Sequence, residues 1–411
     1  MDQTPGLNTS AALRFIFITI FIDVLGLAII IPVIPDLLRE LGHVDYAAAS
    51  GINGLLTATY ASMQVVFSPV MGNLSDRFGR RPIMLISLLG FSVDYTFMAF
   101  APTVFWLFIG RTIAGITGAT MSTATAYIAD ISTGDKRAAN FGIVGAASGL
   151  GFIIGVSGGA FLGEINIKFP FMVAAAAALV NAAYGYFVLP ESLDAEHRRK
   201  FDWKRANPIG SFRQLGKYSS LAGLAAAFTL VYIAQKAVEY QLPFYVYEKF
   251  DWSKKSVGFL GLFIGMLLIV IQGWLIRYLI PKWGLRLNIF VGLISYGAGL
   301  LLIAFASYGW MIYIYMIPYC LGGISGPALQ GMITSKFAKN EQGELQGGLS
   351  LLSSLSLIIG PILMGYTFNI FTLKGSPAYF PGAPYILGAL LMFISTGLAA
   401  VSIKKLVTPD H

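Results

Sequence analysis

Five ionisable side chains lie inside long apolar runs of the sequence, where a charge is costly. They are Asp23, Asp94, Arg111, Lys236 and Glu239. A charge at bilayer depth costs about 2.5 to 3.5 kcal/mol on insertion scales, and it normally faces a partner or a water-filled cavity. A carboxyl group in such a place could take up and release protons. We therefore expect Asp23 or Asp94 to carry a proton, with Arg111 adjusting its proton affinity; a static buried network is the alternative.

Other polar residues in the apolar runs are candidates for a substrate cavity. Lys236 and Glu239 are three residues apart and share one helix face, so they either neutralise each other or line the cavity. Five uncharged residues extend the candidate cavity, although each could instead serve packing: Gln64, Gln235, Gln241, Tyr296 and Gln330. The three histidines, His43, His197 and His411, fall outside the expected spans, so none is placed to carry the proton.

The composition is that of a polytopic membrane protein. The 411 residues are 56% hydrophobic and 12% charged with a mean hydropathy of +0.71, whereas a soluble domain would be about 25% charged. The lone cysteine, Cys320, has no partner, which excludes disulfides and metal frameworks and indicates a core residue. The sequence contains no Lys-containing phosphate loop, metal-ligand cluster or nucleophile elbow. We expect no catalytic residues, no metal and no cofactor other than coupling protons, and so no enzyme.

Polar breaks divide the chain into twelve spans of about 20 residues or more, the length that crosses a bilayer. They run near 14–38, 49–71, 82–101, 104–130, 139–163, 169–189, 219–247, 256–280, 285–306, 309–333, 344–371 and 380–403. One long polar stretch, from Glu191 to Lys217, separates six spans from six. We predict an N-terminal six-helix bundle over 1–190, a cytoplasmic linker over 191–218 that is a tether or a short amphipathic helix, and a C-terminal bundle over 219–411.

The basic residues follow topology. If residues 1–13 face the cytoplasm, twenty of the 28 Lys and Arg residues lie on that side, six lie on the other and two lie within spans. Because cytoplasmic loops carry the excess of Lys and Arg, both termini are predicted to be cytoplasmic. The net charge of +8 then forms no nucleic-acid patch. The first apolar run lacks the features of a signal peptide and is expected to be a retained span.

Two features indicate duplicated halves with close helix contacts. The loop Gly72–Pro82 reads GNLSDRFGRRP, and its counterpart Arg277–Arg286 reads RYLIPKWGLR, with Leu, Gly and Arg at matching offsets but no acid. A switch built on Asp76 therefore belongs to the first half. Span five has glycines at intervals of four from Gly151 to Gly163, which make a face that another helix can approach, either for static packing or for movement of the halves.

With these residues in view, the chain resembles the major facilitator superfamily, its drug:proton antiporter group and, within that group, tetracycline efflux proteins. The stretches that carry the resemblance are YASMQVVFSPVMGNLSDRFGRRPIMLISLLGFSVDY from Tyr60, IGRTIAGITGAT from Ile109, GISGPALQG from Gly323 and QGELQGGL from Gln342. The resemblance implies two pseudo-symmetric six-helix bundles and proton coupling through Asp23, Asp94 and Arg111. It also implies a conformational latch made by Gly72, Asp76, Arg77, Gly79, Arg80, Arg81 and Asp130.

The chain departs from the family pattern in three places, one that concerns a helix bend and two that concern the chemistry of the site. Span five has Gly155-Val156 where Gly-Pro is usual, and Ile269 and Tyr296 stand where tetracycline exporters carry a histidine and an acid. Lys236 and Glu239 instead place charge in span seven.

We therefore expect an all-α membrane protein with the major facilitator fold that exports amphipathic, drug-like compounds, of the tetracycline or multidrug type, against protons. It would act as a monomer among the lipids of the bacterial cytoplasmic (inner) membrane. The alternatives are an exporter or proton symporter of a metabolite or siderophore, and a receptor or scaffold that transports nothing.

Overall fold

The computed structural model of the chain describes residues 9–132, 134–194, 196, 198–199, 201, 222–334, 342–373, 375–376 and 378–407. All regular structure within these residues is helical, as the apolar sequence predicts. Nine of the helical stretches described are long and apolar enough to cross a membrane, and the protein is therefore a multi-pass membrane protein. The chain divides into two compact units, Met1–Gly42 with Thr59–Pro208 and His43–Ala58 with Ile209–His411.

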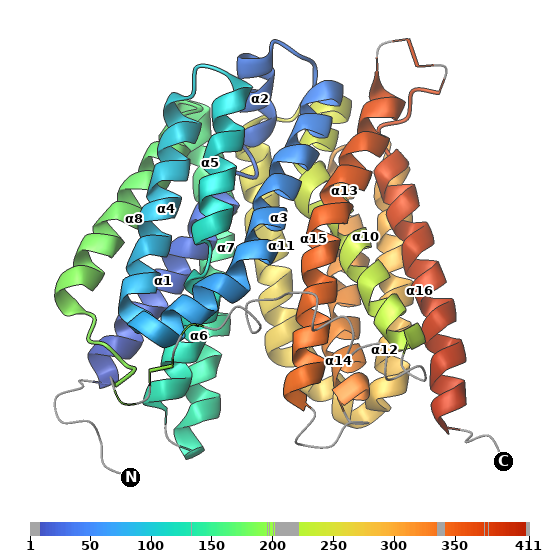
Figure 1. Cartoon of the computed structure of the whole chain (residues 1–411). Coiled ribbons are helices and arrows are strands. Elements are labelled where there is room, and N and C mark those ends of the chain that lie inside the picture. Colours follow the sequence, from blue (N-terminus) through green and yellow to red (C-terminus); the bar gives the residue numbers. More distant parts are fainter. Residues whose placement is uncertain are drawn as a thin grey trace. The chain divides into compact units, whose positions relative to one another are not determined.

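Unit 1 is a helical bundle that carries most of the first six predicted spans (Figure 1). Its helices are α1 (Thr9–Ile29), α2 (Ile34–Gly42), the later part of α3 (Tyr46–Phe78), α4 (Arg80–Phe100), α5 (Val104–Thr117), α6 (Thr120–Ile131), α7 (Gly134–Ile165) and α8 (Phe169–Val188). Phe15 of α1, Leu88 of α4 and Ile128 of α6 are fully buried in one apolar core. This core packs together α1 and α4, the helices that hold Asp23 and Asp94.

Unit 2 contains the remaining helices. They are α10 (Ala222–Phe250), α11 (Lys254–Val270), the π-helical turn η3 (Ile271–Leu275), α12 (Ile276–Ala304), α13 (Trp310–Leu321), the 3-10 turn η4 (Gly322–Ile324), α14 (Ser325–Thr334), α15 (Gln342–Thr372) and α16 (Ala383–Val407). Helices α15 and α16 both lie beside α10 (Figure 1). The first part of α3 also packs in this unit, because the Ser50 hydroxyl donates to Gln241 Oε1 at 2.7 Å.

Each of the twelve predicted spans coincides with a helix or with a broken helix. The stretch Lys254–Ala304 holds two of them. Helices α3 and α10 provide two more, and both carry polar residues such as Gln64 and Lys236. The predicted division into 1–190, 191–218 and 219–411 stays a prediction, because residues 202–221, which make up most of the predicted linker and its amphipathic helix, lie outside the described residues.

Breaks within spans are a feature that the hydropathy pattern does not predict. The expected continuous span over 104–130 is two helices, with Gly118 at φ −70° and ψ 62° between them. A break in a membrane helix frees backbone groups that need new partners. Gln64 supplies one, since its Nε2 donates to the carbonyl oxygen of Gly118 at 3.1 Å and to the Tyr60 hydroxyl at 3.0 Å. A polar residue predicted for the substrate cavity therefore stabilises this break.

The two halves repeat one backbone conformation at matching glycines. Gly79, before α4, has φ 103° and ψ 162°, and Gly284, within the run of α12, has φ 70° and ψ 170°. A residue with a side chain rarely adopts such angles, so glycine is favoured at both places. This agreement supports the internal repeat that the two loop sequences predict.

The glycines of α7 allow α1 to approach closely, as their spacing predicts. A Cβ atom added at Gly155 would lie 2.7 Å from the carbonyl oxygen of Leu25, and one added at Gly159 would overlap the carbonyl oxygen of Ile29. Gly158, one residue earlier, has no atom within 4 Å of its added Cβ. The contact is backbone against backbone, which is typical of small-residue interfaces between membrane helices.

We expect Gly159→Ala to destabilise the protein by about 1 to 3 kcal/mol, because the new methyl group overpacks the contact between α1 and α7. Gly158→Ala is the matched control, and it should be neutral or slightly stabilising because alanine favours the helix. Thermal unfolding of the two purified variants in detergent measures the difference. Equal melting temperatures would contradict this account of the contact.

Candidate functional site

A buried ion pair joins α4 to α5 in unit 1. The Arg111 guanidinium donates from Nε to Asp94 Oδ1 at 3.2 Å, and a second contact joins Arg111 Nη2 to Asp94 Oδ2. The two side chains are almost fully enclosed, with Asp94 0% and Arg111 7% exposed. Two parallel contacts between guanidinium and carboxylate form the geometry that best compensates the removal of both charges from water. The predicted Asp94 and Arg111 are thus brought together.

Helix α3 adds polar and aromatic contacts to this pair. The Arg111 guanidinium lies 5.6 Å from the centre of the Tyr60 ring, within the range of a cation–π interaction. Gln64 donates to the Tyr60 hydroxyl, which extends the polar cluster along α3. Arg111 also contacts the sulfur of Met98 at 3.2 Å. The charge pair is therefore part of a cluster that spans α3, α4 and α5.

Asp23 lies on α1 and is also buried, with 8% of its surface exposed. Its Oδ1 atom has no hydrogen-bond partner among the described residues. Unlike Asp94, Asp23 forms no ion pair within the part of the chain that the structure describes. Asp23 and Asp94, the two buried acids predicted to carry the proton, therefore have opposite surroundings, one unpaired and one paired with a cation.

Unit 2 joins four of the predicted polar residues as two neighbouring pairs, one within α10 and one between α10 and α12. Lys236 forms an ion pair with Glu239, and Gln235 donates to the Tyr296 hydroxyl of α12 at 3.1 Å. Lys236 is 8% exposed, and both alternatives for this pair, mutual neutralisation and lining of a cavity, stay predictions. Gln241 is buried further along α10, and Gln330 lies exposed on α14.

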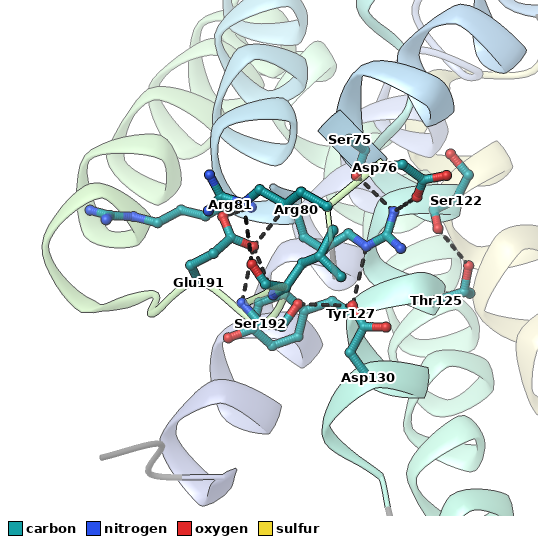
Figure 2. A network of polar contacts seen from close by, with 12 residues as sticks. Ser75, Asp76, Arg80, Arg81, Ser122, Thr125, Tyr127, Asp130, Glu191 and Ser192 are labelled. Carbon is teal, nitrogen blue, oxygen red and sulfur yellow. Dashed lines mark hydrogen bonds and ion pairs between the residues drawn. The ribbon is translucent and has the colours of Figure 1, made fainter. Parts of the chain in front are cut away.

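A second network of charges lies where α3 meets α4, and Figure 2 shows it from close by. The Arg80 guanidinium donates to Asp76 Oδ1 at 2.6 Å and to Asp130 Oδ2 at 3.2 Å. It also donates to the Ser75 hydroxyl at 3.1 Å. Arg80 thus bridges the end of α3 and the end of α6, and three predicted latch residues form one contact set.

The remaining latch residues have different surroundings. Arg77 is exposed, with its guanidinium 4.9 Å from the centre of the Phe78 ring. Arg81 donates to the carbonyl oxygen of Tyr186 in α8. Gly72 has no atom within 4 Å of an added Cβ, so nothing in the described structure requires glycine there.

Glu191 is the residue of this network that sequence reasoning missed. Its carboxylate accepts from the backbone N–H of Arg80 at 2.7 Å and from that of Arg81 at 3.2 Å (Figure 2). These are orphan donors at the start of α4, where Gly79 has no side chain with which to cap the helix. A side chain at Gly79 would overlap the Glu191 carboxylate. The one feature of the sequence that could have indicated Glu191 is its place directly after Pro190, on the same predicted side of the membrane as the basic loop Gly72–Pro82.

Further contacts fasten the chain around Glu191 to the same loop. The Tyr127 hydroxyl donates to the carbonyl oxygen of Pro190 at 2.9 Å, and the Ser192 hydroxyl donates to Asp130 Oδ2 at 3.1 Å. The N–H of Arg199 donates to the carbonyl oxygen of Asp76 at 3.0 Å. The beginning of the predicted linker is therefore bound to the ends of α3, α4 and α6.

Comparison with known proteins shows relatives along nearly the whole chain. The class C tetracycline resistance protein of Escherichia coli is 36% identical over 388 residues, which cover 94% of this chain and 96% of that protein. The class G protein of Vibrio anguillarum is 37% identical over 91% of this chain and 93% of its own. Multidrug resistance protein 2 of Bacillus subtilis (strain 168) is 30% identical, with 94% of each chain covered.

Solved structures and a family model agree with these relatives. The human organic anion transporter MFSD10 (TETRAN) superposes with a TM-score of 0.70 at 22% identity, covering 97% of this chain and 100% of its own. The nucleoside transporter NupG superposes with a TM-score of 0.76 at 10% identity, covering 97% and 100%. The model of the Major Facilitator Superfamily matches residues 16–326. The chain belongs to the major facilitator superfamily of membrane transporters.

Proposed function

We propose that this chain exports amphipathic, drug-like compounds in exchange for protons, by alternating access of two six-helix halves. The single observation that carries the proposal is the buried Asp94–Arg111 pair together with the unpaired Asp23 of the same unit. Relatives named for resistance to tetracycline and to several drugs, similar over about nine tenths of the chain, support export as the direction.

The different surroundings of the two acids support proton coupling. A buried carboxylate is stabilised by a facing guanidinium and is costly without one. Asp94 therefore suits the ionised form, while Asp23, which has no such partner, suits the neutral form. A proton that moves between them would change the charge facing Arg111. This gives the transporter a way to couple proton uptake to a rearrangement of α1, α4 and α5.

For the substrate we propose contacts to the predicted polar residues of each unit. In unit 2 these are the neighbouring pairs Lys236–Glu239 and Gln235–Tyr296. Gln64, Gln241 and Gln330 would add donors and acceptors. Sites for drug-sized ligands are mostly apolar with a few placed polar groups, which fits an amphipathic compound.

For the conformational switch we propose the network of Figure 2 as the latch between the halves. Asp76, Arg80 and Asp130 would provide its charges, and Gly72, Arg77, Gly79 and Arg81 its remaining contacts. Glu191 would connect the linker to the start of α4, so that movement of the linker would shift the loop between α3 and α4. Because the second repeat has Pro281 in place of Asp76, the switch would act from the first half alone.

We propose that the protein works as a monomer in the lipid of the bacterial inner membrane with both termini in the cytoplasm. The excess of basic residues on one side of the spans supports this orientation. The halves would be residues 1–190 and 219–411, with 191–218 as linker.

Asp23→Asn and Asp94→Asn should each abolish pH-driven uptake of tetracycline into everted membrane vesicles, because an amide cannot release a proton. Asp23→Asn is the cleaner variant, since Asp94→Asn leaves the Arg111 charge buried and unpaired, at a cost of about 3 to 5 kcal/mol. Asp194→Asn, which changes an exposed acid outside the helices, is the control and should retain uptake. Full uptake by both test variants would contradict the proposal.

Asp76→Asn should leave tetracycline binding intact but slow exchange between the inward and outward states, because Arg80 loses one of its two carboxylate partners. Equilibrium binding to the purified protein and turnover in proteoliposomes separate the two effects. The latch role fails if turnover of Asp76→Asn equals that of wild type.

Glu191→Ala should weaken the start of α4 by about 0.5 to 2 kcal/mol, the usual cost of removing a helix cap. Backbone hydrogen exchange measured by mass spectrometry should become faster over residues 79–83. Glu191→Gln, which keeps one acceptor oxygen, should have a smaller effect, and Asp194→Ala should have none. Exchange at wild-type rates in Glu191→Ala would rule out this link between linker and loop.

A further inference from the structure

Tyr95 of α4 places a hydroxyl group inside unit 1 that none of the interactions described so far uses. The side chain is 2% exposed, and its ring stacks on Phe91 with 6.2 Å between ring centres. The hydroxyl oxygen is buried and has no hydrogen-bond partner among the described residues. A buried hydroxyl without a partner is costly, so its presence needs an explanation.

The Tyr95 hydroxyl lies against α1, one helical turn from Asp23. A Cβ atom added at Gly26 would lie 2.8 Å from both Cε2 and Cζ of Tyr95 and closer still to the hydroxyl oxygen. Gly26 follows Asp23 by three residues, and residues three apart in a helix share a face. Asp23 Oδ1 is itself buried without a partner. Two unpaired polar atoms, one donor and one acceptor, therefore lie on adjoining faces of α4 and α1.

Tyr95 directly follows Asp94 in α4, so its side chain leaves the helix next to the Asp94–Arg111 pair. The charged and titratable groups that interact electrostatically with the Tyr95 hydroxyl are Asp23 from α1, Asp94 from α4, Arg111 from α5 and Tyr60 from α3. The hydroxyl is thus buried against α1 in the same unit as both acids, and it makes no hydrogen bond to either of them in this structure.

We propose that Tyr95 positions and relays the proton that moves between Asp23 and Asp94, an inference that rests on the proposed function. With the proton on Asp23 and Asp94 ionised, α1 and α4 would first move so that the Tyr95 hydroxyl donates to Asp94 and accepts from Asp23. The hydroxyl then gives its proton to Asp94 and takes the proton of Asp23. Asp23 becomes a carboxylate, Asp94 becomes neutral, and Tyr95 is neutral before and after. One proton moves and no co-reactant is needed.

The transfer changes the partner of Arg111. When Asp94 holds the proton, the Arg111 guanidinium no longer faces a carboxylate and loses the strongest part of its interaction with α4. The reverse transfer restores the ion pair. Tyr95 would in this way couple protonation of Asp94 to the strength of the ion pair between α4 and α5.

Tyr95→Phe tests the relay, because it removes only the oxygen atom. We expect uptake of tetracycline driven by a pH gradient in proteoliposomes to fall by about 100-fold, the lower range for a positioned proton-transfer group. Tetracycline exchange at equal pH on both sides, which needs no net proton movement, should stay near the wild-type rate. A merely structural role would lower both rates together.

Tyr385→Phe is the matched control. Tyr385 of α16 is also fully buried with an unpaired hydroxyl, but its neighbour is the ring of Tyr245 at 4.9 Å between centres, not a charged group. Its substitution should leave both transport modes unchanged. Gly26→Ala, which crowds the Tyr95 ring from α1, should impair gradient-driven uptake like Tyr95→Phe, while Gly158→Ala in open space should not.

The outcomes separate the relay from the function on which it rests. If wild type shows gradient-driven uptake and Tyr95→Phe keeps it, the relay alone is overturned. The relay alone is also overturned if Tyr95→Phe loses gradient-driven uptake and exchange together. Wild-type protein that shows exchange but no gradient-driven uptake would overturn proton coupling and the relay together. Selective loss of gradient-driven uptake in Tyr95→Phe, with Tyr385→Phe unaffected, is the result that the structure leads us to expect.

Discussion

The cost of taking charge out of water is the constraint on which this structure depends. Within unit 1, Asp94 and Arg111 meet that cost with two parallel contacts and a neighbouring aromatic ring. Such a pair is stable only while both partners keep their charge, because removing one leaves the other buried alone. Protonation of the Asp94 carboxylate would remove one of the two charges, so the stability of the pair depends on whether that carboxylate carries a proton.

Backbone polar groups obey the same constraint. The span that holds Arg111 is broken at Gly118, and the carbonyl freed there accepts from the amide of Gln64. Gln64 also contacts Tyr60, whose ring lies near the Arg111 guanidinium. The break in the helix and the ion pair are therefore joined through one short chain of contacts on α3. A change in the state of Arg111 has a physical route to the irregular backbone that follows α5.

The loop network solves a related problem at the other end of α4. Four backbone N–H groups at a helix start lack partners within the helix, and Glu191 satisfies two of them from more than a hundred residues away along the chain. The carboxylate also suits the positive end of the helix dipole. Since Arg80 in turn joins Asp76 and Asp130, the start of the linker and three helix ends form one connected network.

The sequence by itself determined the membrane class, the twelve spans, the buried charges and the glycine face of α7, because hydropathy, charge and small-residue spacing act locally. The matching glycines Gly79 and Gly284 were likewise visible as a repeat. Only the tertiary structure decided that Arg111 pairs with Asp94, that Gln64 supports a helix break, that Glu191 caps α4 and that Tyr95 packs against Gly26 of α1. These contacts join side chains distant along the chain, and their partners are set by helix packing, which local sequence patterns do not specify.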